Sequence, residues 1–157
     1  MRIAVGADHA GFPRKGSAIA ELRRLGHEVI DLGTHSEEPV DYPDIAQAVG
    51  EAVMRGEADR GVLICGSGIG ASVAANTMPG VRAAVCHDTF SARQGVEDDD
   101  LNVLCLGARI VGSELALEII RAWAAAVFSN AERHVRRVGK VRAMEQRYQR
   151  DTEVSHR

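Results

Sequence analysis

The sequence predicts an α/β protein with a parallel five-stranded sheet, and the order of its apolar segments carries that prediction. Five short runs rich in Val, Ile, Leu and Ala are each followed by a turn signal, which is typical of buried strands. They span residues 2–8, 28–33, 61–66, 81–88 and 102–107. Helix-like segments separate these runs, and such alternation favours a parallel sheet with helices covering both faces.

The helical segments are delimited by residues that suit helix ends. Gly26 follows the first helix where a C-terminal stop is expected, Pro43 suits the first turn of the second, and the dipeptide 79–80 marks the turn after the third. Helices are expected over 14–25, 43–55, 70–77, 89–97, 113–128 and 131–150. We therefore expect one domain over residues 1–150, ending in the helix 131–150, and a loose tail over 151–157.

Composition excludes several classes of protein. At 157 residues the chain is long enough to bury a core without disulfide or metal staples, and its net charge of −3 does not favour nucleic acid as a partner. No signal-like or membrane-spanning apolar run is found, and the three cysteines form no C-x-x-C pair. We therefore expect a cytoplasmic protein with no membrane partner.

Polar and glycine residues follow four of the predicted strands. Asp8 and His9 follow the first, residues 65–70 end the third, His87 and Asp88 end the fourth, and residues 107–109 end the fifth. Because ligands of open parallel sheets bind beyond the carboxyl ends of the strands, these groups are expected to converge there.

The glycine loop after the third strand allows three interpretations. Gly66, Gly68 and Ala71 match the dinucleotide pattern G-x-G-x-x-A, with Asp88 available for a ribose hydroxyl. That loop does not open the fold, however, and the chain leaves no room for a second domain. A cysteine phosphatase loop would need a closing arginine, and this loop runs on to alanine and serine instead.

The third interpretation makes the loop amides an oxyanion site beside a reactive cysteine. A helix N-terminus favours the thiolate form of a cysteine, and Cys65 stands at a strand end against the glycines. A base next to preorganised donors is what proton abstraction beside a carbonyl requires, as in sugar isomerisation. Cys86 and Cys105 lie inside apolar strands and are expected to be small buried hydrophobes.

Several motifs together resemble the ribose-5-phosphate isomerase B and galactose-6-phosphate isomerase family. They cover about residues 1–150 in order and read GADHAGF (6–12), DYPD (41–44), ICGSGIGASVAANTMPGVRAA (64–84), NVLCLGARIVG (102–112) and RHVRRV (133–138). The resemblance implies a three-layer α/β/α sandwich with a five-stranded parallel Rossmann-like sheet. It also implies a homodimer with shared active sites, with a tetramer possible, and an enzyme that uses no cofactor and no metal.

The resemblance also assigns roles to residues. Cys65 would shuttle a proton between C1 and C2 of the sugar with assistance from Ser67. Asp8 and Tyr42 would lie against the sugar. The backbone amides that would hold the enediolate come from Gly66, Gly68 and Gly70, and the groups that would approach the phosphate, some of them from the partner subunit, are His9, Arg109, Arg133 and Arg137. Arg133 and Arg137 are four apart on a predicted helix and share a face.

One segment departs from the family pattern. Asp98 stands where the family usually offers a histidine that opens the sugar ring, and Asp99 stands where an asparagine is common. A carboxylate is a poor proton donor at neutral pH unless burial or neighbouring acids change it. Asp98 is therefore a candidate ring-opening acid, or the substrate is one that cannot cyclise, such as a tetrose phosphate.

The expected function is the isomerisation of a phosphorylated aldose to a ketose, with ribose 5-phosphate and ribulose 5-phosphate as the first expectation. Erythrose 4-phosphate with erythrulose 4-phosphate is the leading alternative, and an isomerase of unphosphorylated rare sugars is a further one. From another class, a nucleotide-binding module would keep the glycine loop without needing Cys65. The consecutive acids 98–100 cannot all converge from one regular element, which argues against a metal site.

Overall fold

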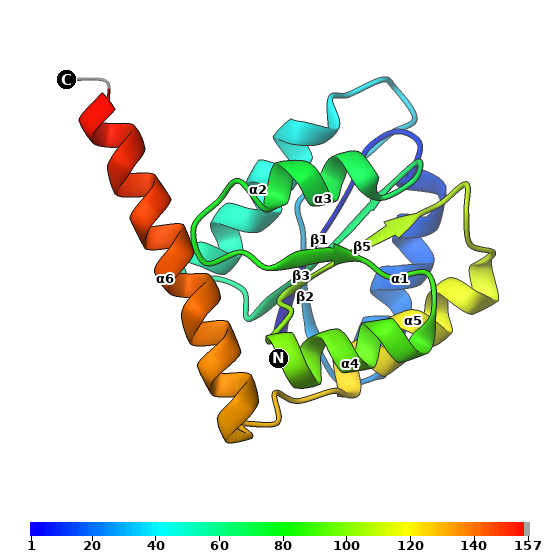
Figure 1. The fold of residues 1–157 in the computed structure, drawn as a ribbon. Helices are drawn as coiled ribbons and strands as arrows, with labels where there is room; N and C mark the ends of the chain where they lie inside the picture. Colours follow the sequence, from blue (N-terminus) through cyan, green and yellow to red (C-terminus); the bar gives the residue numbers. More distant parts are fainter. Residues whose placement is uncertain (156–157) are drawn as a thin grey trace.

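The structure is a computed structural model that describes residues 1–155, with side chains through Gln149, and Figure 1 shows its arrangement. These residues form five strands and six helices. In chain order the elements are β1 (Arg2–Ala7), α1 (Phe12–Arg24), β2 (Glu28–Asp31), α2 (Tyr42–Met54), β3 (Arg60–Cys65), α3 (Ile69–Ala75), β4 (Ala83–Val85), α4 (Thr89–Asp99), β5 (Val103–Gly107), α5 (Ser113–Ala125) and α6 (Glu132–Ser155).

The strands form one parallel sheet in the order β2-β1-β3-β5-β4. Side chains alternate between its two faces, because successive residues of a strand point in opposite directions. In β3, Val62 and Ile64 enter the core under α1, α4 and α5, whereas Leu63 and Cys65 enter the core under α2 and α3. The sheet is therefore buried on both faces, and the expected α/β/α sandwich is confirmed.

The ends of the elements differ from the predicted ones in two places. β4 is shorter than the predicted strand 81–88, because it is an edge strand that pairs only with β5 within the described residues. Helix α6 continues to Ser155, so the loose tail expected after residue 150 is wrong for residues 151–155. Those residues contain neither glycine nor proline, and nothing in the backbone forces the helix to end at 150. Residues 156–157 lie outside the described residues.

Helix α6 stands at one side of the sandwich and projects past it (Figure 1). Several contacts tie it to the body: the backbone N–H of Gly80 donates to Glu145 at 2.9 Å, Arg142 lies 3.4 Å from Asp100, and His134 lies 3.4 Å from Asp98. None of the helices in residues 1–155 has the length and apolar character needed to cross a membrane.

Helices α1 and α5 lie side by side on one face and are joined by a buried carboxylate. Glu21 of α1 accepts from Arg24 of the same helix at 3.0 Å and from Arg121 of α5 at 2.6 Å. The hydrogen bonds from Arg24 and then from Arg121 lower the pKa of Glu21 from 4.5 to about 2. The ionised form is thus the one that links the two helices.

The Glu21→Gln variant tests this link. The native pKa lies below the ordinary value, so ionised Glu21 contributes its full stabilisation above about pH 4.5 and loses it as the pH falls towards 2. Both proteins should be unfolded in urea between pH 2 and 7. The difference in their free energy of unfolding should grow from pH 2 to about pH 4.5 and stay constant from there to pH 7. A difference that does not vary with pH would contradict this role.

Glu51→Gln is the matched control. Glu51 pairs with Arg55 on the exposed side of α2 at 3.0 Å. Because exposed ion pairs contribute little, this variant should change stability by less than about 1 kcal/mol across the same pH range.

Candidate active site

The site lies where the turns after β1 and β3 meet, at the point where the order of the strands reverses. The backbone N–H of Asp8 donates to the carbonyl of Ile64 at 3.2 Å, so the two strand ends are held together. The carboxylate of Asp8 accepts from the N–H of Gly11 at 2.9 Å and is only 8% exposed. Such switch points at the carboxyl edge are where open α/β sheets bind ligands.

An open cavity of about 300 Å³ occupies this point. Seven of the predicted site residues, drawn from five parts of the chain, line it together with one residue that was not predicted. They are Asp8, Tyr42, Cys65, Gly66, Ser67, Gly70, Arg109 and Ile110. The structure thus brings the sugar-binding and proton-transfer candidates to one place.

Cys65 is the last residue of β3 and is 5% exposed. Its Sγ accepts a hydrogen bond from the backbone N–H of Gly68 at 3.1 Å. Gly68 has a φ of +81°, a left-handed conformation that favours glycine, and this turn of the backbone directs its N–H at the sulfur. Ser67, on the same loop, is exposed and its Oγ accepts from the N–H of Ile69 at 3.3 Å. The loop therefore stabilises negative charge on Cys65 with a backbone donor.

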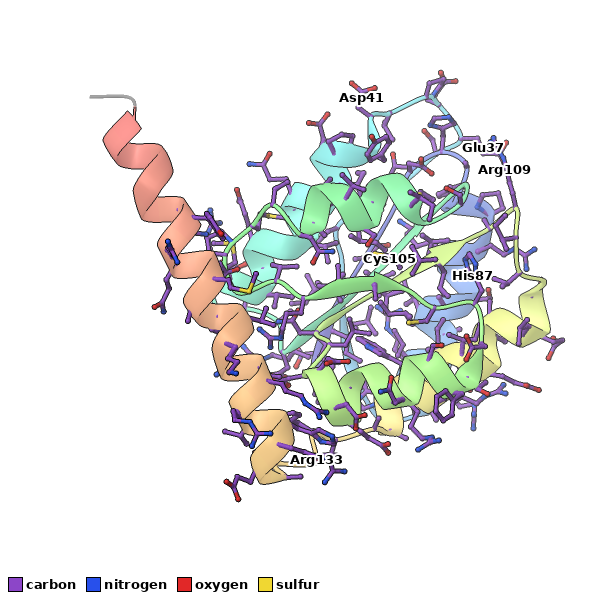
Figure 2. All side chains as sticks on the ribbon, viewed as in Figure 1. Glu37, Asp41, His87, Cys105, Arg109 and Arg133 are labelled. Atoms are coloured by element: carbon purple, nitrogen blue, oxygen red, sulfur yellow. The ribbon has the colours of Figure 1, made fainter. Side chains whose placement is uncertain are left out.

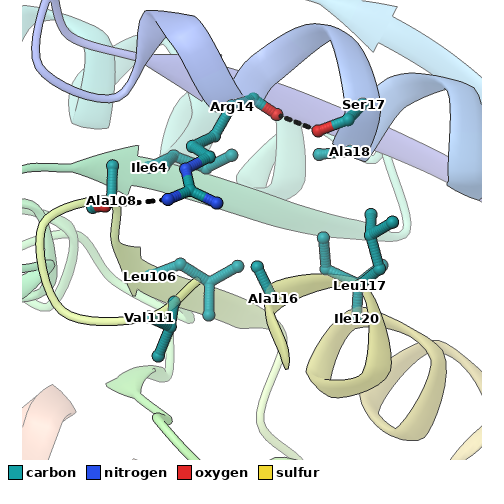
Figure 3. Close-up of a pocket in the computed structure, with 10 residues that line it drawn as sticks. All are labelled: Arg14, Ser17, Ala18, Ile64, Leu106, Ala108, Val111, Ala116, Leu117 and Ile120. Atoms are coloured by element: carbon teal, nitrogen blue, oxygen red, sulfur yellow. Dashed lines mark hydrogen bonds between the residues drawn. The ribbon is translucent and has the colours of Figure 1, made fainter. Parts of the chain in front are cut away.

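Arg109 lies across the glycine loop from the end of β5. Its backbone N–H donates to the carbonyl of Gly66 at 3.0 Å, and its Nη1 lies 3.3 Å from where a side-chain carbon at Gly66 would stand. From α1, Arg14 reaches this turn: it donates to the carbonyl of Ala108 at 3.5 Å (Figure 3) and to Ser113 Oγ at 2.6 Å. Arg109 thus places a fixed positive charge at the cavity.

Tyr42 begins α2 and covers the start of α3. Its ring lies so close to Gly70 that a side-chain carbon at that position would stand 2.7 Å from the ring. The neighbouring His9 follows Asp8 and accepts from the backbone N–H of Val40 at Nδ1, at 3.2 Å. In the neutral ring this bond leaves the proton on Nε2. His9 is half-buried and is not among the residues that line the cavity.

Sequence comparison agrees with this arrangement. The profile of the ribose/galactose isomerases matches residues 3–141. The chain belongs to the ribose/galactose isomerase family.

Named relatives and a solved structure show how close the similarity is. The chain is 48% identical over 146 residues to ribose-5-phosphate isomerase B of Escherichia coli, covering 93% of this chain and 97% of the relative. It is 42% identical to D-erythrulose-4-phosphate isomerase of Pectobacterium atrosepticum, covering 82% and 85%. The structure of ribose-5-phosphate isomerase B of Clostridium thermocellum superposes with a TM-score of 0.91 at 49% identity, covering 94% and 99%. The predicted family and the class of aldose–ketose isomerase are confirmed.

The other two cysteines of this isomerase do not resemble Cys65. Burial, with a smaller effect of Asp88, raises the pKa of Cys86 to about 11, and burial raises the pKa of Cys105 still further. Both thiols are therefore neutral at physiological pH, in line with the small buried hydrophobes expected from the sequence. Among the side chains of residues 1–149, no group of three or more His, Cys, Asp or Glu converges as a metal site would require.

Four predicted site residues lie elsewhere in the same chain. Asp98 and Asp99 end α4 at the amino edge of the sheet, and Arg133 and Arg137 lie on the first turns of α6. Figure 2 shows Arg133 at the end of the molecule opposite Arg109. One chain by itself therefore does not bring these four residues to the cavity.

Two residues next to the site were missed or set aside in the sequence. Ile110 lines the cavity, and its position directly after Arg109 is the signal that could have found it. His87, treated as secondary, accepts from the N–H of Gly107 at Nε2, at 3.3 Å. A side-chain carbon at Gly107 would stand 2.7 Å from the backbone of Ser67, so His87 supports the glycine loop from behind.

The Gly70→Ala variant tests whether the placement of Tyr42 is needed for isomerase activity. The added methyl group meets the ring of Tyr42, an exposed side chain that can move, so stability should change by no more than about 1 kcal/mol. Displacement of the ring from the cavity should lower kcat/KM at least about tenfold, since small misplacements are costly in catalysis. Steady-state kinetics and thermal unfolding measure the two effects.

Gly16→Ala is the control. Gly16 lies on α1 with no atom within 4 Å of an added side-chain carbon, so this variant should keep full activity and gain up to about 1 kcal/mol of stability. Full activity of Gly70→Ala would show that the position of Tyr42 is unimportant.

Proposed function

We propose that this protein interconverts a phosphorylated aldose and its ketose, ribose 5-phosphate and ribulose 5-phosphate, through an enediolate. The observation that carries the proposal is the placement of the Cys65 sulfur in the wall of a cavity that also holds Asp8, Tyr42 and Arg109. A base, backbone donors and a fixed cation in one cavity are what this reaction needs. The names of the relatives from Escherichia coli and Clostridium thermocellum support the choice of sugar.

The reaction follows from the roles of these groups. The thiolate of Cys65 removes the proton from C2 of the open-chain aldose, and the electrons of that C–H bond form the C1–C2 double bond while O1 becomes negative. The backbone amides of residues 66–70 stabilise this oxyanion. Cys65 then returns the proton to C1, and the proton of the C2 hydroxyl passes to O1, which leaves the carbonyl at C2. Ser67 and Asp8 lie close enough to assist the transfers between oxygens.

We propose further that the active unit is a homodimer in which each site takes residues from both chains. Arg133 and Arg137 are exposed, and within residues 1–149 they make no ion pair. Arg133 lies far from Arg109 of its own cavity (Figure 2), and Arg137 follows four residues later on the same helix. A two-fold related partner brings residues from one end of a chain to the opposite end of the other.

Charge and apolar surface support the same assembly. Helix α6 carries a basic face, and the segment 37–44 is acidic; Figure 2 shows Glu37 and Asp41 at the same end of the molecule as Arg109. Between α6 and the edge strand β4 lies a groove of about 790 Å³. Val141 and Met144, which line this groove, are exposed and form an apolar surface that a second copy would cover. The three free cysteines also agree with the cytoplasmic location expected from the sequence.

Erythrose 4-phosphate is the second candidate substrate, and Asp98 favours it. The residue that replaces the usual ring-opening histidine is an acid, and a tetrose phosphorylated on its terminal hydroxyl cannot close a five-membered ring. The relatives from Pectobacterium atrosepticum and Mycolicibacterium smegmatis are named as D-erythrulose-4-phosphate isomerases. Sequence similarity to both kinds of relative is high, so the sugar has to be measured.

The experiment that tests the function is isomerisation of ribose 5-phosphate and erythrose 4-phosphate side by side, followed by NMR. We expect turnover of the pentose, and loss of turnover by about 10²- to 10⁴-fold in the Cys65→Ala variant, whose fold and sugar binding remain. A clear preference for the tetrose would select the second candidate. Retained activity of Cys65→Ala would remove the thiol from proton transfer, and tight binding of NAD or ATP in calorimetry would favour a nucleotide-binding module instead.

Mixed dimers test the shared site. Arg137→Ala should weaken phosphorylated substrates far more than sugars without phosphate, because a guanidinium binds the phosphate oxygens. Cys65→Ala and Arg137→Ala chains, each defective alone, should regain about a quarter of wild-type activity when refolded together in equal amounts, since half the dimers are hybrids with one intact site. A site built within one chain would show no recovery.

A further inference from the structure

A buried histidine at the amino edge of the sheet is not used by the proposed proton transfer between C1 and C2. His134 of α6 is 5% exposed and lies between two side chains from different elements. Its Nδ1 is 2.6 Å from the Oγ of Ser129, and its Nε2 is 3.4 Å from the Oδ1 of Asp98 at the end of α4. Gln94 donates to the other carboxylate oxygen of Asp98 at 2.7 Å.

The hydrogen bonds assign the protons of this cluster. An ionised Asp98 only accepts, so the proton of neutral His134 lies on Nε2. Nδ1 then accepts from the hydroxyl of Ser129, whose oxygen in turn accepts from the backbone N–H of Ala131 at 3.2 Å. If the hydroxyl of Ser129 turns away, Nδ1 is free to take a proton and donate back to the serine oxygen. The pair of Asp98 and His134 can therefore hold one additional proton.

Only the carboxylate of this pair reaches the surface. The side chain of Asp98 is 32% exposed and that of His134 is 6% exposed. Arg133 and Arg137 stand next to His134 and three residues after it on α6, and Glu97, which precedes Asp98 on α4, is paired with Arg93 at 2.9 Å. Asp98 thus presents a proton-carrying group beside the two arginines that the proposed dimer brings to the phosphate of the substrate.

Ring opening is the step for which such a group is needed. Ribose 5-phosphate closes its ring through O4, and opening it moves the proton of the C1 hydroxyl to O4 while the C1–O4 bond breaks and the C1 carbonyl forms. A lone carboxylate is a poor proton carrier at neutral pH, whereas an imidazole gains and loses a proton there. A carboxylate backed by a histidine combines an exposed contact atom with a suitable base.

We propose, on the basis of the function and dimer proposed above, that Asp98 and His134 act together to open the sugar ring in the cavity of the partner chain. Asp98 is the catalytic residue: it takes the proton from the C1 hydroxyl and returns one to O4, so no net proton is gained or lost. His134 is a positioning residue that acts through Asp98, orienting its carboxylate and sharing the proton during the transfer. Ser129 sets the orientation of the imidazole ring.

Two reactions, one of ribose 5-phosphate and one of ribulose 5-phosphate, distinguish a role of Asp98 and His134 in ring opening from a purely structural role. Conversion of ribose 5-phosphate requires ring opening. Exchange of a C1 proton of ribulose 5-phosphate with solvent deuterium requires only the enediolate step, because this ketose has its terminal hydroxyl phosphorylated and stays open. We would measure both by NMR for His134→Phe and for Asp98→Asn, which keeps the shape of the side chain but cannot carry the proton.

The expected result is a fall of at least about tenfold in the ratio of conversion to exchange for both variants. Glu145→Gln is the matched control: it loosens the contact of α6 with Gly80 and should lower both rates in proportion, leaving the ratio unchanged. Equal loss of both rates in His134→Phe and in Asp98→Asn, or no loss, would overturn the proposal. If the wild-type protein catalyses neither reaction, the proposed function itself fails.

Discussion

The close packing of the turn after β1 against the end of β3 is the constraint on which the whole site depends. Gly11 approaches the carbonyl of Ile64 so closely that a side-chain carbon there would stand 1.9 Å from that oxygen. The same carbonyl accepts from the N–H of Asp8. Because that bond fixes the end of β1 against the end of the neighbouring β3, Asp8 and Cys65 face one cavity although they are 57 positions apart in the sequence.

A second set of contacts continues this arrangement across the sheet. The carbonyl of Cys65 accepts from Ala108 at 2.8 Å, and that of Gly66 accepts from Arg109, so the loop after β3 is bound to the turn after β5. With the loop bound in this way, Gly68 keeps its left-handed conformation, and its backbone N–H points at the sulfur of Cys65. Preorganisation of this kind is what allows backbone donors to stabilise a charge that develops during the reaction.

Much of the fold and of the candidate site could be predicted from the sequence, because the signals that carry them lie in short segments of the chain. Apolar runs that end in glycine or a charged residue identify buried strands and their carboxyl ends, and in a parallel sheet those ends share one edge. Residues such as Asp8, Cys65 and Arg109 could therefore be assigned to the same place without coordinates. His134 could not, because its importance rests on a contact with Asp98 between two helices. The periodicity of a helix predicts which face is buried, but not which polar side chain of another helix lies against it.

The end of the chain shows the same limit. An amphipathic basic helix could be predicted near residues 131–150, but not the direction in which it leaves the body. That direction is set by the contacts of Glu145 with Gly80, of Arg142 with Asp100 and of His134 with Asp98, which join residues far apart in the sequence.

These contacts also restrict where the arginines proposed to bind the phosphate can lie. Because α6 is fastened to the amino edge of the sheet at residues 80 and 100, Arg137 cannot swing to the cavity at the carboxyl edge of its own chain without breaking them. A rigid helix that carries cations away from the acidic rim of its own site has them available for the site of a neighbour. The isologous dimer proposed above uses both ends of each chain, since each chain offers one cavity and one basic helix. The anchoring of α6 thus does more than stabilise the helix: it keeps Arg133 and Arg137 away from the cavity of their own chain, which is the reason that the proposed site draws on two chains.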